Sequence, residues 1–333
     1  MDETCMHVVK NNFGIEAEKI ELLVNHSGSV TYLVSTKCSK YVLKRTGHNG
    51  HGESGGLLAE YLHNNGIKVA RFFQTTDGKY AFYDEYYQYT LQEFIHGQQL
   101  PLNTAPDWLM LKYVQTLGQI QKVLKDYKLP PTAYYNWPKW LTSMQPVEDH
   151  EKTIGEKIIH AQETGDLSLA AALNRRLQHI RRVAAFNIDP GKLTHVNSHG
   201  DYYINQVILR DGELFVIDWD SGGHAPACFE VMIAFTYADP VCKTGIIDIT
   251  RFWPFLLEYM KYTGLSSYDV KMMPYFTYRY LCFCQFIPPY DSLSDDYLQI
   301  ARLSDTLMDW LYENVDILSA QLVEKLENEE NTQ

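Results

Sequence analysis

Short β-prone runs separated by turn residues occupy the first 87 residues, whereas apolar residues recur every three or four positions after about residue 106. β-prone runs bounded by turn residues are typical of strands, and a spacing of three to four is typical of amphipathic helices. The pattern therefore predicts an α+β protein, in which a small antiparallel sheet is followed by a mostly helical region.

Five strands and two helices are expected in the strand-rich part. Three strands lie within 20–45, and two more lie within 68–87 across a Thr-Asp-Gly turn. Residues 1–20 have the pattern of an amphipathic helix, and a second helix at 57–67 stops at an Asn-Gly pair. The helical part is expected to contain helices at 107–127, one or two within 150–186, and further helices at 226–239, 248–264, 266–286 and 293–315.

One hairpin interrupts the helical part. The β-prone runs QVILR and LFVID are separated by Asp211-Gly212, a pair typical of two-residue hairpin turns. Asp201 lies in the loop before the first of these strands, and Asp218 ends the second. A hairpin of this kind can hold a base and a metal-binding acid against one reacting group, which is what phosphoryl transfer needs.

Composition narrows the class of protein. The chain has 333 residues, with 45% hydrophobic and 21% charged residues, as in a globular protein of one large or two modest cores. No window approaches eighteen consecutive apolar residues, so a membrane partner is not expected. The N-terminus has no secretory pattern, so a cytoplasmic location is expected. A net charge of −12 without a basic tract argues against nucleic acid as a partner.

Two clusters are interpreted structurally. The six cysteines are scattered, and the one close pair, Cys282 and Cys284, is interpreted as buried thiols rather than a metal site. Four arginines lie near the end of 150–186 on more than one helix face, so acid pairing or solvation is favoured over a phosphate clamp: Arg175, Arg176, Arg181 and Arg182.

The hairpin also carries a resemblance. His199-Gly200-Asp201, a polar amide five residues later and Ile217-Asp218-Trp219 resemble the HGD…N…IDW signature of the aminoglycoside phosphotransferase/choline kinase-like superfamily. The resemblance extends loosely from about residue 15 to about 310. It implies a two-lobed protein-kinase-like fold, with an N-lobe at 1–87, a helical C-lobe at 88–320 that holds the catalytic hairpin 195–223, and an acidic tail at 321–333 that is a frayed helix end or disordered. Spore-coat-kinase-like and sugar-kinase-like branches come into consideration.

The resemblance implies ATP and Mg²⁺ as cofactors and a hydroxyl on a small molecule as acceptor. Asp201 is then the catalytic base, and His199 is expected to brace the loop beside it. Asp218 would bind Mg²⁺ together with Gln206, which stands where the superfamily usually has Asn; Asn205 is the alternative. Asp220 is interpreted as a residue near the acceptor or the metal. Glu230 is interpreted as a structural residue.

The nucleotide side is assigned to the strand-rich part. Lys44 is expected to point inward from the third strand and neutralise the α- and β-phosphates, paired with Glu53 or, as an alternative, Glu60. The segment 83–86 resembles the adenine-binding hinge, followed by a helix at 90–97. The residues assigned to the phosphate turn and the hinge are Ser27, Gly28, Ser29, Glu85 and Tyr86.

Two classes of function remain open from sequence. The first is an ATP- and Mg²⁺-dependent phosphotransferase acting on an aminoglycoside or other antibiotic, a sugar or an amino alcohol. The second is a kinase-like binding or structural protein with weak or no catalysis. A protein kinase is disfavoured because no activation segment with an APE-type ending follows Asp218. The oligomeric state is not predicted.

Overall fold

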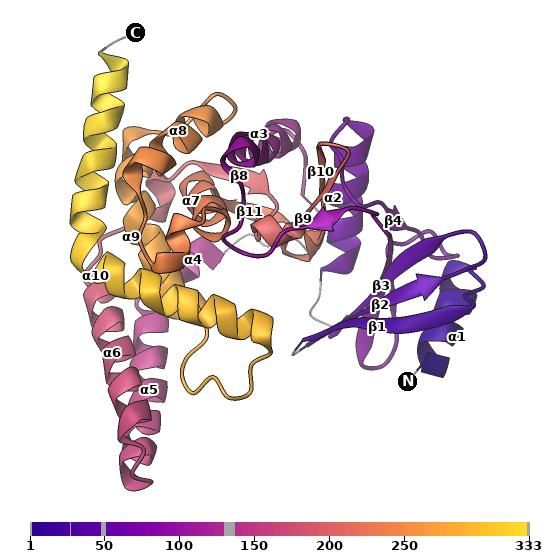
Figure 1. The fold of residues 1–333 in the computed structure, drawn as a ribbon, viewed down its shortest axis with the longest axis horizontal. Helices are drawn as coiled ribbons and strands as arrows, with labels where there is room; N and C mark the ends of the chain where they lie inside the picture. The colour runs from indigo at the N-terminus through magenta and orange to yellow at the C-terminus, as the bar shows by residue number, and fades with distance from the viewer. Residues whose placement is uncertain (1, 27, 48–50, 130–136, 332–333) are drawn as a thin grey trace. The chain divides into compact units, whose positions relative to one another are not determined.

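The structure is a computed structural model that describes residues 2–26, 28–47, 51–129 and 137–331. Its residues form two compact units, each built from three segments of the chain (Figure 1). The first unit comprises Met1–Pro101, Gln119–Tyr134 and Asn197–His224, and the second comprises Leu102–Gly118, Tyr135–Val196 and Ala225–Gln333. The hairpin around Asp211-Gly212 therefore groups with the strand-rich N-terminal part.

The main sheet of the first unit is antiparallel throughout, as predicted, and has six strands. Its order is β1-β2-β3-β6-β4, with β5 also paired to β6. The strands are β1 (Lys19–His26), β2 (Ser29–Ser35), β3 (Lys40–Gly47), β4 (Phe72–Phe73), β5 (Ala81–Tyr83) and β6 (Tyr87–Glu93). The helix expected at 90–97 is wrong in its first half, because Thr90 to Glu93 belong to β6 between β3 and β4.

Helix α1 (Asp2–Phe13) covers one face of this sheet (Figure 1). Its buried Val9 and Phe13 share a hydrophobic cluster with Leu43 of β3 and Leu91 of β6. Because side chains alternate between the two faces of a strand, Leu43 on the α1 side places Lys44 on the other side. The inward orientation of Lys44 thus follows from the core that its neighbour joins.

Helix α2 (Gly52–Asn64) begins five residues earlier than the apolar spacing predicted. Its first turns contain glycines, which are unfavourable in helices, and close packing explains the presence of two of them. A methyl group on Gly55 would lie 3.1 Å from the carbonyl oxygen of Trp219, and one on Gly56 would overlap the Tyr80 side chain. The two glycines therefore allow α2 to pack closely on Trp219, just after the hairpin, and on Tyr80.

The hairpin around Asp211-Gly212 has the geometry that its sequence predicts. Strands β9 (Val207–Arg210) and β10 (Glu213–Val216) pair antiparallel around Asp211 and Gly212, whose φ angles are 51° and 76°. Positive φ at both central residues is the requirement of a tight hairpin turn that preserves strand twist. Strand β7 (Gln98–Gln99) adds to β9, and β8 (His195–Ser198) pairs with β11 (Gly223–Pro226).

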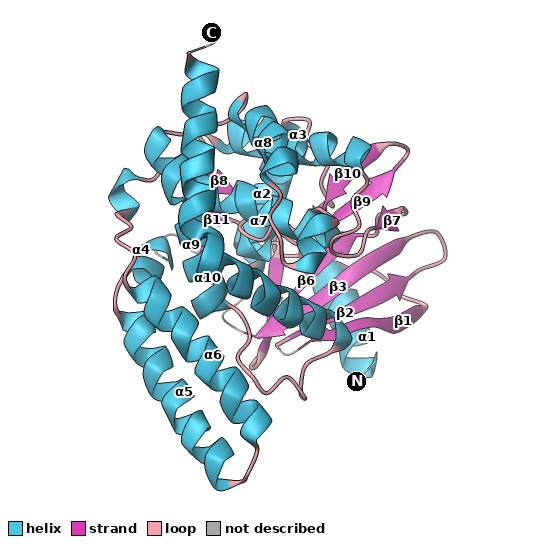
Figure 2. Cartoon of the chain, turned by 60° about the vertical axis from the view of Figure 1, so that its left-hand side comes forward, coloured by secondary structure: helices cyan, strands magenta, loops and turns pink. Residues whose placement is uncertain are grey.

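The second unit consists mainly of helices, as the 3–4 spacing predicted. Helices α5 and α6 run side by side (Figure 2). The helices that lie in this unit or extend into it are α3 (Asp107–Leu124), α4 (Trp137–Thr142), α5 (Gln145–Glu163), α6 (Leu167–Ala184), α7 (Ala227–Ala238), α8 (Ile249–Met260), α9 (Ser267–Cys284) and α10 (Asp295–Glu330), and short 3-10 turns lie at η1 (Pro190–Lys192) and η4 (Val241–Thr244). The acidic residues from 321 are part of α10 up to Glu330. Within the described residues, none of the helices combines the length and apolar character needed to cross a membrane.

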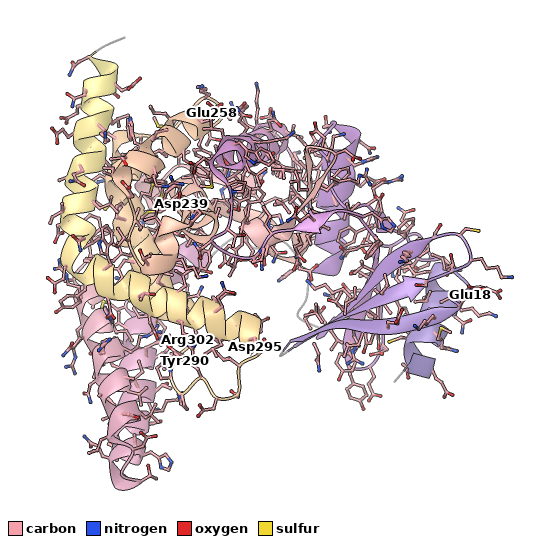
Figure 3. All side chains as sticks on the ribbon, in the orientation of Figure 1. Glu18, Asp239, Glu258, Tyr290, Asp295 and Arg302 are labelled. Atoms are coloured by element: carbon pink, nitrogen blue, oxygen red, sulfur yellow. The ribbon has the colours of Figure 1, made fainter. Side chains whose placement is uncertain are left out.

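Several charged side chains of the second unit pair with one another. The expected acid pairing of the arginines is confirmed: Arg176, 2% exposed, contacts Asp305 at 2.9 Å, and Arg182 contacts Asp316 at 2.6 Å. At the end of α7, Asp239 accepts a hydrogen bond of 2.7 Å from Arg251 (Figure 3, where Asp239 is labelled). Arg176 and Arg182 thereby join α6 to residues of α10 that come 129 and 134 positions later.

Candidate active site

The side chains of Lys44, Asp218 and Asp220 form one charge cluster in the first unit. The Lys44 ammonium lies 2.5 Å from Asp218 Oδ1 and 2.9 Å from Asp220 Oδ2, and the lysine side chain is only 14% exposed. Burial alone would lower the pKa of Lys44, but the two carboxylates raise it above its ordinary value. Lys44 is therefore a charged group on the face of the sheet opposite α1.

Asp218 lies where the hairpin turns into the short helix η3 (Trp219–Ser221). Its backbone has φ 62° and ψ 65°, a left-handed conformation that few residues other than glycine adopt. The amide of Ile217 just before it donates to the carbonyl oxygen of Gln206 at 2.9 Å. Burial raises the pKa of Asp218, but Lys44 outweighs burial and holds that pKa below the ordinary value. The carboxylate is therefore ionised.

His199 is fully buried beside these residues. Its Nε2 lies 2.8 Å from the carbonyl oxygen of Ile217, and its Nδ1 lies 3.3 Å from the amide nitrogen of Asp201. Its ring packs against the Trp219 ring, with centroids 4.7 Å apart. Burial lowers the pKa of His199, so the ring is neutral, with Nε2 donating and Nδ1 accepting. Through these contacts His199 connects the loop that carries Asp201 to the strand that leads to Asp218.

Asp201 occupies the loop that His199 and Gly200 position. Gly200 has φ 81°, and a methyl group there would overlap the carbonyl oxygen of Ser221. Burial, aided by the negative charge of Asp218, raises the pKa of Asp201 to about 7, while a hydrogen bond from Tyr203 opposes this shift. A carboxylate with a pKa near neutrality is suited to accept a proton from an acceptor hydroxyl.

Gln206 and Asn205 lie in the short helix η2 (Ile204–Gln206), next to the strand that leads to Asp218. The backbone of Gln206 is tied to Ile217, and its side chain is half-buried. The Oδ1 atom of Asn205 is buried and has no hydrogen-bond partner among the described residues, and the same holds for Oδ1 of Asp220. Carboxylate and amide oxygens are the ligands that Mg²⁺ prefers. The residues present therefore fit a magnesium ion.

A model of the phosphotransferase enzyme family matches residues 22–249, more than half of the chain. The chain belongs to this family. A search of curated protein sequences gave no significant match. The hairpin that carries Asp201 and Asp218 lies inside the matched range.

Solved structures of phosphotransferases share the fold. An amicoumacin kinase in complex with AMP-PNP, Ca²⁺ and its antibiotic is 16% identical, with a TM-score of 0.63 and coverage of 92% of this chain and 93% of that chain. A microcompartment-associated aminopropanol kinase is 15% identical (TM-score 0.61, coverage 96% and 99%). Spectinomycin phosphotransferase in complex with ADP and spectinomycin is 14% identical (TM-score 0.60, coverage 97% and 98%). At these identities the likeness establishes the fold, which is the α+β fold that the sequence predicted.

In this member of the family, the expected pairing of Lys44 with Glu53 is replaced by other contacts. The Glu53 carboxylate accepts hydrogen bonds from the amides of Tyr80 at 2.7 Å and Ala81 at 3.0 Å. Glu60, the alternative, accepts a hydrogen bond from the Tyr80 hydroxyl. Among the described residues, the acids that pair with Lys44 are the two aspartates after the hairpin. Glu53 instead holds the first turn of α2 against β5.

The hinge expected at Glu85 and Tyr86 is a second correction. Both residues lie in the turn between β5 and β6, where the Asp84 carboxylate accepts from the amides of Tyr86 at 2.8 Å and Tyr87 at 2.7 Å. Tyr86 is 65% exposed. The chain then re-enters the sheet as β6, so this turn is not the connection that leaves the sheet.

The phosphate turn is described in part. Ser27 lies outside the described residues, whereas Gly28, with φ 86°, lies in the turn and Ser29 is the first residue of β2.

The partner of Asp220, which is Lys44, was not predicted from the sequence. Asp220 comes only two residues after Asp218, so the sequence already places both carboxylates in one short segment.

Proposed function

We propose that this protein transfers the γ-phosphoryl group of ATP to a hydroxyl of a small molecule, with Mg²⁺ as cofactor. The observation that carries the proposal is the Lys44–Asp218–Asp220 charge cluster, held in the same compact unit as a carboxylate whose pKa is raised to about 7. Phosphoryl transfer needs charge neutralisation and a base for the acceptor hydroxyl, and these groups supply both.

Each residue has a distinct role in the proposal. Asp201 hydrogen-bonds the acceptor hydroxyl and takes its proton as the hydroxyl attacks phosphorus. His199 positions Asp201 through its backbone amide and does not itself transfer a proton. Lys44 neutralises phosphate charge from β3. Asp218 and the amide oxygen of Gln206 would hold magnesium, which would neutralise charge on the phosphate oxygens when bound.

The adenine site is proposed in the segment that follows β6. That strand lies next to β3 and ends at Glu93, so residues 94–97 are the connection that leaves the sheet beside the lysine strand. Gly97 allows this connection to approach β9, since a methyl group there would lie 2.6 Å from the carbonyl oxygen of Leu209. Ser27, Gly28 and Ser29 remain proposed for the phosphates, because small residues in a β-turn let backbone amides approach an anion.

The acceptor is proposed as a small hydroxyl compound. The compared structures are those of kinases of amicoumacin, spectinomycin and aminopropanol, which supports antibiotics and amino alcohols as the first compounds to test. A net charge of −12 favours a cationic acceptor over an anionic one through long-range attraction. Sugars complete the panel.

The test is transfer of radiolabelled γ-phosphate from ATP across this panel, with wild type and two variants. Asp201→Asn should lower kcat by about 10²-fold or more while AMP-PNP binding is unchanged, because it removes the base and keeps the shape of the loop. Asp211→Asn is the matched control: it removes an exposed carboxylate from the same hairpin, and asparagine tolerates the left-handed conformation there. Transfer by Asp201→Asn within about threefold of wild type would remove Asp201 from the role of base.

Gln206 favours one alternative, a kinase-like protein that binds nucleotide with weak or no transfer. Glutamine places its amide oxygen one methylene farther from the backbone than the usual asparagine. Calorimetry decides between the two functions: tight AMP-PNP binding without transfer to any member of the panel supports the alternative, and transfer to any of them excludes it.

A further inference from the structure

The end of helix α3 is capped by a side chain from another segment of the first unit. The last carbonyl groups of a helix have no partner within the helix itself. At α3, the Nδ2 atom of Asn197 lies 2.9 Å from the carbonyl oxygen of Leu124 and 2.8 Å from that of Tyr127. A side-chain amide has two N–H donors, so Asn197 uses both of them on the end of α3 and the turn that follows it.

The oxygen of the same amide faces a second strand. Asn197 lies on β8, and its Oδ1 atom lies 3.0 Å from Nδ1 of His224 on β11. Carbonyl oxygens can only accept, so the two at α3 fix which side of the amide carries the nitrogen, and His224 is then the donor to Oδ1. One side chain therefore connects the end of α3 with both strands of the small sheet formed by β8 and β11.

These two strands flank the residues assigned to the chemistry. Strand β8 leads directly into the loop of Asp201, and β11 begins three residues after Asp220. The two segments are in close contact, since a methyl group on Gly200 would overlap the carbonyl oxygen of Ser221. A shift of β8 against β11 therefore moves the loop of Asp201 against the segment that follows Asp218.

A second hydrogen bond fastens β8 to the same helix. Ser198 is fully buried, and its Oγ atom accepts a hydrogen bond of 3.0 Å from Gln121, which is 3% exposed. Gln121 and Leu124 are three positions apart and so share one face of α3. Tyr127 is held in turn, because its ring packs on the ring of Tyr61 of α2 with centroids 4.4 Å apart. The groups that hold β8 are thus themselves fixed.

We propose that Asn197 is a positioning residue for Asp201, which acts by fastening β8 and β11 to the end of α3 and to each other. This inference rests on the proposed function of the site. The rate of transfer depends steeply on the position of the base, because a displacement of about 1 Å can cost about 10²-fold. Loss of the Asn197 amide therefore lowers kcat and leaves nucleotide affinity, which is assigned to the main sheet, nearly unchanged.

Hydrogen–deuterium exchange of the full-length, nucleotide-free protein tests the anchor without a transfer assay. Asn197→Ala should raise the exchange rate of the peptide that contains residues 199–204 at least about fivefold, because two hydrogen bonds that hold β8 are lost. Peptides from β2 and β3 should exchange as in wild type. Asn174→Ala is the matched control, because the Asn174 amide donates to the carbonyl oxygen of Ala170 within α6 and its loss should leave residues 199–204 unchanged.

Asn197→Ser keeps the test decisive if Asn197→Ala does not fold, because a hydroxyl retains one donor. Exchange at residues 199–204 equal to that of wild type in a folded Asn197 variant overturns the inference. An equally large rise in β2 and β3 also overturns it, because that pattern reports a loss of overall stability.

Transfer kinetics with a substrate from the panel separate positioning from stability. The kcat of Asn197→Ala should fall about tenfold or more, with KM for ATP within about threefold of wild type. The midpoint of its kcat/KM profile should move to lower pH, because a loosened loop is less buried and burial is what raises the pKa of Asp201. Faster exchange with unchanged kcat and midpoint overturns the positioning role. Faster exchange in the variant, when wild type phosphorylates no member of the panel, supports the anchor and refutes the proposed function instead.

Discussion

Replacement of His199 separates a bracing role from proton transfer. The side chain is fully buried, donates to the carbonyl of Ile217 and packs on Trp219. His199→Ala leaves that carbonyl without its partner, at a cost of about 1–3 kcal/mol, and opens a cavity whose cost is about 2 kcal/mol. The free energy of unfolding should therefore fall by about 3–5 kcal/mol. His199→Gln retains a donor on a side chain of similar length and should cost about half as much.

Urea unfolding, followed by tryptophan fluorescence, measures the stability of both variants, and initial rates with a substrate found in the panel measure activity. If His199 is a brace, activity follows stability: Gln retains kcat within about tenfold of wild type, and Ala loses far more. If His199 transfers a proton, both variants lose about 10²-fold or more alike, because neither alanine nor glutamine carries a titrating group. Equal and large losses of kcat in two well-folded variants would refute the bracing role.

Two further predictions concern the base and the core of the second unit. Because the pKa of Asp201 is raised to about 7, kcat/KM should rise with pH through about 7 and level off above it, since a protonated carboxyl cannot accept a proton; a profile flat from pH 5 to 9 would contradict this. Arg279, 1% exposed, donates to the carbonyl oxygens of three residues, so Arg279→Met should lower the free energy of unfolding by about 2–4 kcal/mol in a urea titration. The control Arg182→Met loses an exposed pair with Asp316 and should cost less than about 1 kcal/mol; similar losses in both variants would contradict the reasoning.

The parts of the site that were predictable are those encoded in contiguous residues. The Asp211-Gly212 turn fixes the pairing of β9 with β10, and its two positive φ angles are the ones for which that pair is selected. The order of strands from β1 to β3 follows from short β-prone runs and the turns between them. Lys44 pointing away from α1 follows from alternation with the buried Leu43.

The parts that failed depend on contacts between distant segments. The residues near Glu53 in sequence do not indicate that its carboxylate will accept hydrogen bonds from the amides of Tyr80 and Ala81. These amides approach α2 only through the folding of the sheet. Gly55 and Gly56 argue against a helix by propensity, yet close packing requires them. Strand β6 is different, since its buried Tyr89 and Leu91 alternate with polar residues, a signal that was present in the sequence.

The separation of the charged residues along the chain gives the cluster an order of assembly. The hydrogen bond from Ile217 to Gln206 closes a loop of about eleven residues, whereas Lys44 and Asp218 are 174 positions apart. Four doublings of loop length cost about 2.4 kcal/mol more in chain entropy. The hairpin that leads to Asp218 therefore forms with the smaller loss of chain entropy, and the contact with Lys44 forms with the larger loss. During biosynthesis, the strand that carries Lys44 leaves the ribosome long before its partners exist, so this ammonium remains hydrated until the hairpin is made.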